Sequence, residues 1–78
     1  MENIIKDIGE RLHGMRDIMD ISVTEMALET GVSEADYLSI EAGNKDFSFT
    51  FLFKAANRFG LDMTELITGE APHLSGYT

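Results

Sequence analysis

Residues 22–43, SVTEMALETGVSEADYLSIEAG, decide the fold, because this stretch combines two helix starts, a tight turn and a helix stop. Ser22 stands three residues before Glu25, the spacing at which two side chains cap the start of a helix reciprocally. Gly31 ends the resulting helix of about seven residues, since glycine adopts the left-handed conformation of a helix end without steric cost.

A second short helix is expected directly after that turn. Ser33 is a candidate N-cap, with Asp36 at the third helical position. Tyr37 and Ile40 are spaced to face inward, and Gly43 ends the helix. Two short helices joined by a tight turn that contains glycine form a helix-turn-helix, whose second helix lies in the major groove in proteins that bind DNA.

The composition predicts one small globular domain. A chain of 78 residues has room for a single core, and no apolar run approaches the ~18 residues that span a bilayer. The first residues lack the basic and apolar regions of a signal peptide, so we expect a cytoplasmic protein without membrane contact. The chain has no cysteine, which excludes disulfides and thiolate metal sites.

The net charge argues against simple phosphate binding. Fourteen acidic residues stand against six Lys and Arg residues, which gives a net charge of -8. A domain that binds nucleic acid usually carries a basic surface. The motif and the charge therefore favour different functions.

A longer helix of roughly seventeen residues is expected before the motif. Gly9 and Gly14 fall inside it, and each weakens a helix by about 1 kcal/mol relative to alanine. They mark either close contacts with a neighbouring helix or tolerated defects, and we favour the second interpretation. The apolar residues of one face of this helix are Ile5, Ile8, Leu12, Met15 and Met19.

A fourth helix is expected over residues 49–59. The alternation in residues 47–53 also suits a strand, but Ser48 can cap a helix and Gly60 can end one. Its inward face is expected to contain Phe49, Leu52, Ala56 and Phe59.

A short fifth helix is expected to close the domain. Asp62 and Glu65 form another capping pair, and apolar residues follow before Gly69. The expected organisation is therefore an all-α, compact five-helix domain over residues 1–69, with the motif at 22–43. Residues 70–78 are expected to be a tail or a linker.

Catalytic and metal-binding patterns are missing from the sequence. His13 and His73 lack the nearby ligands that a zinc site requires. No glycine pattern resembles a loop that holds a phosphate, and no serine has the context of a nucleophile. We therefore expect neither an enzyme nor a bound metal or cofactor.

With the helices placed, residues 8–69 resemble the lambda-repressor-like or Cro-type helix-turn-helix family, also called the XRE family. The resemblance implies the DNA-binding domain of a bacterial or phage transcription regulator, often dimeric on a palindromic operator. Residues 69–78 resemble the junction to a small-molecule-binding domain of the cupin type. The matching residues are Ile8-Gly9-Glu10-Arg11-Leu12, Met15-Arg16, Ile21-Ser22, Glu25-Met26-Ala27, Gly31-Val32-Ser33, Ile40-Glu41-Ala42-Gly43, Leu52, Ala56, Gly60 and Glu65-Leu66.

The second motif helix departs from the family pattern. Members usually carry polar or basic side chains along the exposed part of this helix. They also usually carry a glutamine just after the cap of the first motif helix, where this chain has Val23. Arg, Lys, Gln and Asn read guanine or adenine through paired hydrogen bonds, whereas Glu or Asp accepts one from cytosine. Glu41 matches a structural acid of the family. The candidate DNA-contacting residues are Arg16, Ser22, Ser33, Glu34, Ala35, Asp36, Ser39, Asn44 and Lys45, with Arg16, Asn44 and Lys45 as phosphate anchors.

A second candidate surface is an aromatic and basic patch on the fourth helix. A helical wheel places Phe51 opposite Phe49, on the same face as Lys54 and Arg58. The patch suggests contact with a second subunit or with a C-terminal domain beyond this chain. The alternative is that the aromatic rings are incidentally exposed or turn into the core. The candidate partner-binding residues are Phe47, Phe51, Lys54 and Arg58.

Two functions remain open on the sequence alone. The first is the DNA-binding domain of a bacterial transcriptional regulator, with double-stranded DNA as a weakly bound partner of the isolated domain. The second is a helix-turn-helix fold retained as a protein-protein interaction module, which the acidic charge favours.

Overall fold

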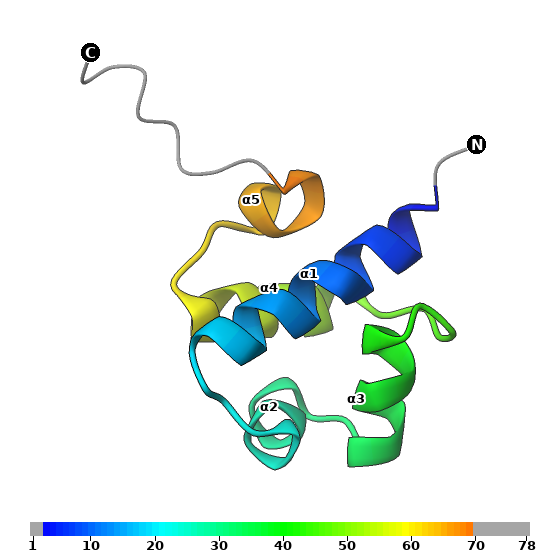
Figure 1. Cartoon of the computed structure of the whole chain (residues 1–78), viewed down its shortest axis with the longest axis vertical. Helices are drawn as coiled ribbons and strands as arrows, with labels where there is room; N and C mark the ends of the chain where they lie inside the picture. The colour runs from blue at the N-terminus through cyan, green and yellow to red at the C-terminus, as the bar shows by residue number, and fades with distance from the viewer. Residues whose placement is uncertain (1–2, 70–78) are drawn as a thin grey trace.

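The computed structural model describes residues 3–69, and this part of the chain contains five helices and no strand (Figure 1). The expected all-α architecture is confirmed. The first helix is slightly shorter than predicted, because the chain leaves it at Met19 and Asp20 adopts a φ of 54°. The tail expected at residues 70–78 lies outside the described residues. The helices are α1 (Ile4–Ile18), α2 (Val23–Thr30), α3 (Glu34–Glu41), α4 (Phe49–Phe59) and α5 (Met63–Thr68).

The predicted caps fix where three of the helices begin. The side chains of Ser22, Ser33 and Ser48 each accept a hydrogen bond of 3.0 Å from the amide three residues ahead. Such a bond satisfies one of the amide groups that a helix start leaves without an internal partner. Gly31 adopts a φ of 78° and ends α2, so the predicted turn of the motif is confirmed.

The helices enclose one core (Figure 1). In this view α1 crosses in front of α4, α5 lies above them, and α2 and α3 lie below. None of the helices in the described residues is long and apolar enough to cross a membrane. The buried apolar residues are Ile8, Leu12, Ile21, Met26, Ala27, Tyr37, Ile40, Phe51, Leu52, Ala55, Ala56, Phe59 and Leu66.

The rotation of α4 about its axis differs from the prediction. Phe51 is only 2% exposed, whereas Phe49 is 75% exposed. Phe51 fills the space beside Tyr37 of α3, with the two ring centroids 6.0 Å apart. The buried stripe is therefore centred on Ala55, and Phe49 falls at its outer edge. The prediction that Phe49 faces inward was wrong.

Gly9 marks a close contact between α1 and α3, contrary to the favoured interpretation. A Cβ atom at Gly9 would lie 2.6 Å from the carbonyl oxygens of Ile40 and Glu41. Gly14 has no atom within 4 Å of the equivalent position, so it is the tolerated defect that the sequence suggested. The backbones of α1 and α3 meet where only glycine fits.

Candidate nucleic-acid interface

The α2-turn-α3 unit presents the start of α3 to solvent. Glu34 and Ala35 are exposed, and the side chain of Asp36 is 50% exposed. Ser39 is half-buried one turn further along. The structure therefore brings four of the predicted contact residues to the outer surface of α3 or to its edge.

The polar side chains on this surface already interact with one another. The Thr24 hydroxyl donates a hydrogen bond to Glu34 Oε2 at 3.0 Å, which joins α2 to the start of α3. Lys45 Nζ lies 3.9 Å from Asp36 Oδ1. Lys45, the one base of the predicted DNA-contacting set that lies on this surface, is thus partly neutralised by an acid of α3. The contact of Thr24 with Glu34 has no signature in the spacing of the residues, because it joins two different helices.

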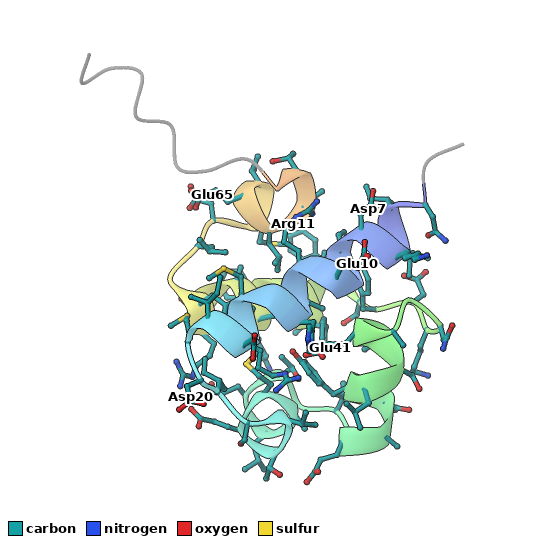
Figure 2. All side chains as sticks on the ribbon, in the orientation of Figure 1. Asp7, Glu10, Arg11, Asp20, Glu41 and Glu65 are labelled. Carbon is teal, nitrogen blue, oxygen red and sulfur yellow. The ribbon has the colours of Figure 1, made fainter. Side chains whose placement is uncertain are left out.

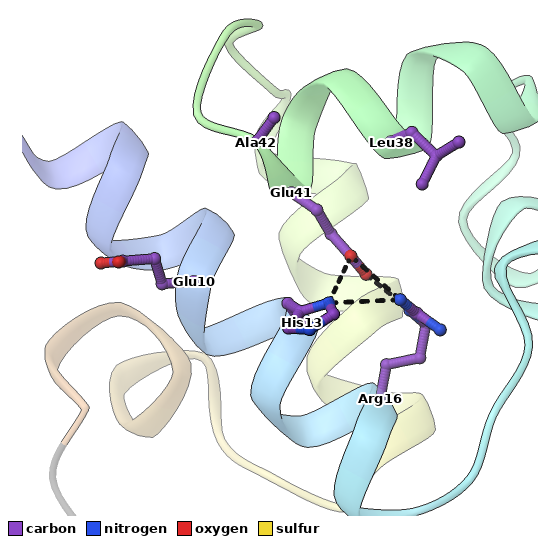
Figure 3. Close-up of a pocket in the computed structure, with 6 residues that line it drawn as sticks. All are labelled: Glu10, His13, Arg16, Leu38, Glu41 and Ala42. Carbon is purple, nitrogen blue, oxygen red and sulfur yellow. Dashed lines mark hydrogen bonds and ion pairs between the residues drawn. The ribbon is translucent and has the colours of Figure 1, made fainter.

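Arg16 lies between α1 and α3 and contacts Glu41 (Figure 3). Its Nε is 2.7 Å from Glu41 Oε2, and its Nη2 is 3.2 Å from Oε1. Its Nη1 donates to the carbonyl of Ile21 at 3.2 Å. The Arg16 side chain is 17% exposed and the Glu41 side chain 6%. Arg16 is therefore engaged in an ion pair within the fold, and its contact with DNA stays a prediction.

Glu41 is the structural acid that the resemblance implies. Burial alone raises its pKa, but hydrogen bonds from Arg16 and other neighbours outweigh burial and hold the pKa below its ordinary value. His13 also contributes, because its Nδ1 lies 3.1 Å from Glu41 Oε1. The hydrogen bond between Arg16 and Glu41 also raises the pKa of Arg16. The pair therefore stays charged at neutral pH and ties the end of α3 to α1.

The lowered pKa of Glu41 predicts a stability that depends on pH. A carboxyl group whose pKa is lowered by folding stabilises the folded state at pH values above its ordinary pKa of 4.5. This stabilisation is lost as the pH falls through the pKa of the folded state. We expect the difference in unfolding free energy between the wild type and Glu41→Gln to shrink from about pH 6 to about pH 2. Thermal unfolding of both proteins across this range measures it. A constant difference would contradict the assignment.

Other bases are held within the fold as well. Arg58 of α4 pairs with Glu25 of α2. Arg11 donates to the carbonyls of Leu66 and Ile67 at 2.7 and 2.8 Å, so it caps the end of α5. Figure 2 shows Arg11 between α1 and α5, Glu41 between α1 and α3, and Glu65 at the outer edge of α5.

The aromatic and basic patch predicted on α4 does not assemble. Phe51 is buried, and Phe47 is half-buried and stacks on Phe51 with a centroid distance of 5.9 Å. Arg58 is paired, and Lys54 alone of the predicted group is fully at the surface. Phe51 follows the alternative in which the aromatic rings turn into the core, because α4 turns this ring towards α3.

In the residues that the structure describes, no group of three side chains could hold a metal ion. An open hollow lies between α1 and α3 (Figure 3). It contains the ion pair described above, so Arg16 and Glu41 already have partners within the fold. Its lining residues are Glu10, His13, Arg16, Leu38, Glu41 and Ala42.

The comparisons with known proteins agree with this geometry. A family model described as a helix-turn-helix domain matches residues 9–72. No curated protein matches the chain. The restriction-modification controller protein C.AhdI from Aeromonas hydrophila is similar in structure, with a TM-score of 0.72 and 24% identity over 81% of this chain and 94% of that chain. This likeness confirms the five-helix, lambda-repressor-like fold.

Proposed function

The chain belongs to the helix-turn-helix domain family, and on this premise we propose that it is the DNA-binding domain of a bacterial transcriptional regulator with an unusually acidic recognition helix. The observation that supports the proposal most strongly is the solvent-facing start of α3, which follows α2 after a tight turn. Helix-turn-helix proteins place this part of the second helix against base edges.

The proposed contacts differ in chemistry along the surface. Ser22, Ser33 and Asn44 can hydrogen-bond to phosphates, and Lys45 adds a charge. Glu34 and Asp36 can accept hydrogen bonds from cytosine amino groups. Because Lys45 is the one base among the proposed contacts on the described surface of α3 and several acids lie beside it, we infer weak binding by the isolated domain.

The same proposal covers the organisation of the regulator. Two copies occupy the halves of a palindromic operator, and residues 70–78 lead from the domain to a C-terminal sensor or dimerisation domain. Binding and repression or activation need no catalysis, so the proposed regulator is not an enzyme. It acts in the cytoplasm, where bacterial DNA is accessible.

Two substitutions at one ion pair test DNA binding. Lys45→Glu is expected to weaken binding about tenfold and to lower the salt dependence by about one counterion. Asp36→Asn is expected to tighten binding, because it frees Lys45 from its acidic neighbour. Fluorescence anisotropy with genomic DNA fragments at about 50 mM salt measures both effects.

Lys54→Glu is the matched control, since Lys54 is an exposed lysine on α4 outside the proposed contact surface. It makes the same change in net charge and is expected to weaken binding much less than Lys45→Glu. Equal effects of the two variants would show that only overall charge matters. Absence of binding by the wild-type dimer at this salt concentration would overturn the proposed function.

The acidic surface of α2 and α3 favours a second function, the binding of a basic protein. Glu25, Glu29 and Glu34 are exposed there, and Leu28 is 79% exposed among them. Under this alternative, Lys45→Glu leaves function intact, whereas Glu34→Gln together with Asp36→Arg weakens partner binding. Creation of DNA binding by that double variant, in a protein that otherwise has none, would favour this second function.

A further inference from the structure

We propose that Leu38 is a specificity-determining residue of α3, and that its exposed side chain contacts the 5-methyl group of a pyrimidine base in the major groove. The proposed function, on which this inference rests, places α3 in that groove. Leu38 is 49% exposed, although it is a large apolar residue. It is not among the DNA contacts predicted from the sequence, because a leucine side chain carries neither a charge nor a hydrogen-bonding group.

The side chain of Leu38 is not used by the core. It belongs neither to the hydrophobic core nor to the half-buried apolar residues that pack against the core. Its neighbours on the exposed side of α3 are Ala35, three positions before it, and Ala42, four positions after it. Leu38 and Ala42 also line the open hollow between α1 and α3 (Figure 3), so α1 leaves this side of α3 accessible. Leu38 therefore has the longest apolar side chain on this side of the helix.

The side chains of α3 do not suit purine bases. Arg and Lys pair with guanine, and Asn and Gln pair with adenine, through hydrogen bonds to the major-groove edge. The sequence of α3 is EADYLSIE, which contains none of these four residues. A carboxylate instead accepts a hydrogen bond from the cytosine amino group, and an apolar side chain contacts the methyl group of thymine. Both of these features belong to pyrimidines, so the surface of α3 is complementary to pyrimidine edges.

Glu34 lies on the same side of α3 as Leu38, because the two residues are four positions apart. The Thr24 hydroxyl holds its carboxylate through a hydrogen bond of 3.0 Å to Oε2. A carboxylate accepts several hydrogen bonds, so Glu34 can still accept one from a cytosine amino group. Four residues of a helix span about 6 Å, and stacked bases are about 3.4 Å apart. Glu34 and Leu38 therefore reach the same base or two neighbouring bases.

A methyl contact adds affinity that needs no positive charge. The chain carries a net charge of -8, so its acidic surface is repelled by phosphates. Burial of one methyl group is expected to strengthen binding about fourfold. The 5-methyl group occurs on thymine and on 5-methylcytosine, and it has the same apolar chemistry on both bases. Salt screens charges but not this contact, so the methyl effect is expected to persist while the total affinity falls with salt.

Single-atom-group changes in DNA test this contact. The wild type is first used to enrich duplexes from a pool of random sequence at about 50 mM salt. In an enriched duplex, each thymine is then replaced singly by uracil, which lacks only the 5-methyl group, and each cytosine by 5-methylcytosine. Fluorescence anisotropy is expected to show an affinity loss of about fourfold at a thymine or a gain of about fourfold at a cytosine. A loss identifies thymine as the base that Leu38 contacts, and a gain identifies 5-methylcytosine.

Leu38→Ala assigns the methyl effect to this side chain. The variant is expected to abolish the response to the methyl group at one position of each half-site, because the coupling between the two changes measures their contact. Ile18→Ala is the control, since Ile18 is another large aliphatic residue, 80% exposed on α1. It is expected to keep every methyl effect. Leu38 lies outside the core, and thermal unfolding followed by circular dichroism establishes that both variants fold.

The possible outcomes separate this contact from the proposed function. A wild type that enriches no duplex would overturn the proposed function and the methyl contact together. A wild type that binds DNA but responds neither to uracil nor to 5-methylcytosine would overturn the methyl contact alone. Methyl effects of the same size in Leu38→Ala and in the wild type would also overturn it, because another residue would then contact the methyl group.

Discussion

Replacement of Arg16 by methionine is expected to lower the free energy of unfolding by about 3–5 kcal/mol. The substitution leaves the Glu41 carboxylate in a site where its side chain is only 6% exposed, without its nearest positive charge. Removal of one member of a buried ion pair is costly because the remaining charge has lost both water and partner. A domain of this size has a total stability of about 4–12 kcal/mol.

Urea unfolding at neutral pH measures this effect, and thermal unfolding is expected to shift downward by at least about 12 °C. The double variant Arg16→Met/Glu41→Leu separates a lost charge pair from lost packing. It is expected to recover most of the stability, because no buried charge remains. If the single variant lost less than about 1 kcal/mol, as a surface pair does, the ion pair would not hold α3 in place.

Substitution of Gly9 by alanine is expected to destabilise the domain by about 1–3 kcal/mol, although alanine favours a helix. The new methyl group would lie 2.6 Å from two carbonyl oxygens at the end of α3. Both oxygens belong to the backbone, so the two helices must separate. Separation also stretches the contacts that Arg16 makes with Glu41.

Gly14→Ala in the same helix is the control. No atom lies within 4 Å of the added carbon, so the variant is expected to gain up to about 1 kcal/mol from helix propensity. The two variants make the same chemical change and differ only in surroundings. Urea unfolding of both proteins therefore measures the cost of the contact, and a gain in stability for both would contradict it.

Local signals in the sequence predicted the helices well. The start and the end of a helix can be predicted from a few neighbouring residues, as at Ser33, where α3 begins, and at Gly31, where α2 ends. The geometry at both places is set by the local backbone. The rotation of α4 was harder to predict, since Phe49 and Phe51 have equal hydrophobicity. The choice between them is made by Tyr37, which comes from another helix.

The predicted site had the same limitation. The sequence indicated Glu34, Asp36 and Lys45 as candidate contact residues, because the two acids lie in the first turn of one short helix and Lys45 lies in the loop after it. It could not show that Arg16 is bound to Glu41, since 25 residues separate them. The sequence alone therefore overestimates the number of bases free for phosphate, and a base can be counted as free only when its partners in space are known.

The two ends of α3 are held in different ways. Its last turn is fixed by the Arg16 ion pair and by the backbone contact at Gly9. Its first turn is attached to α2 by the surface contact of Thr24 with Glu34. Substitutions at the first turn therefore cost little stability, which leaves these positions free to diverge. During evolution, the first turn of α3 can therefore acquire new binding preferences while its last turn preserves the fold.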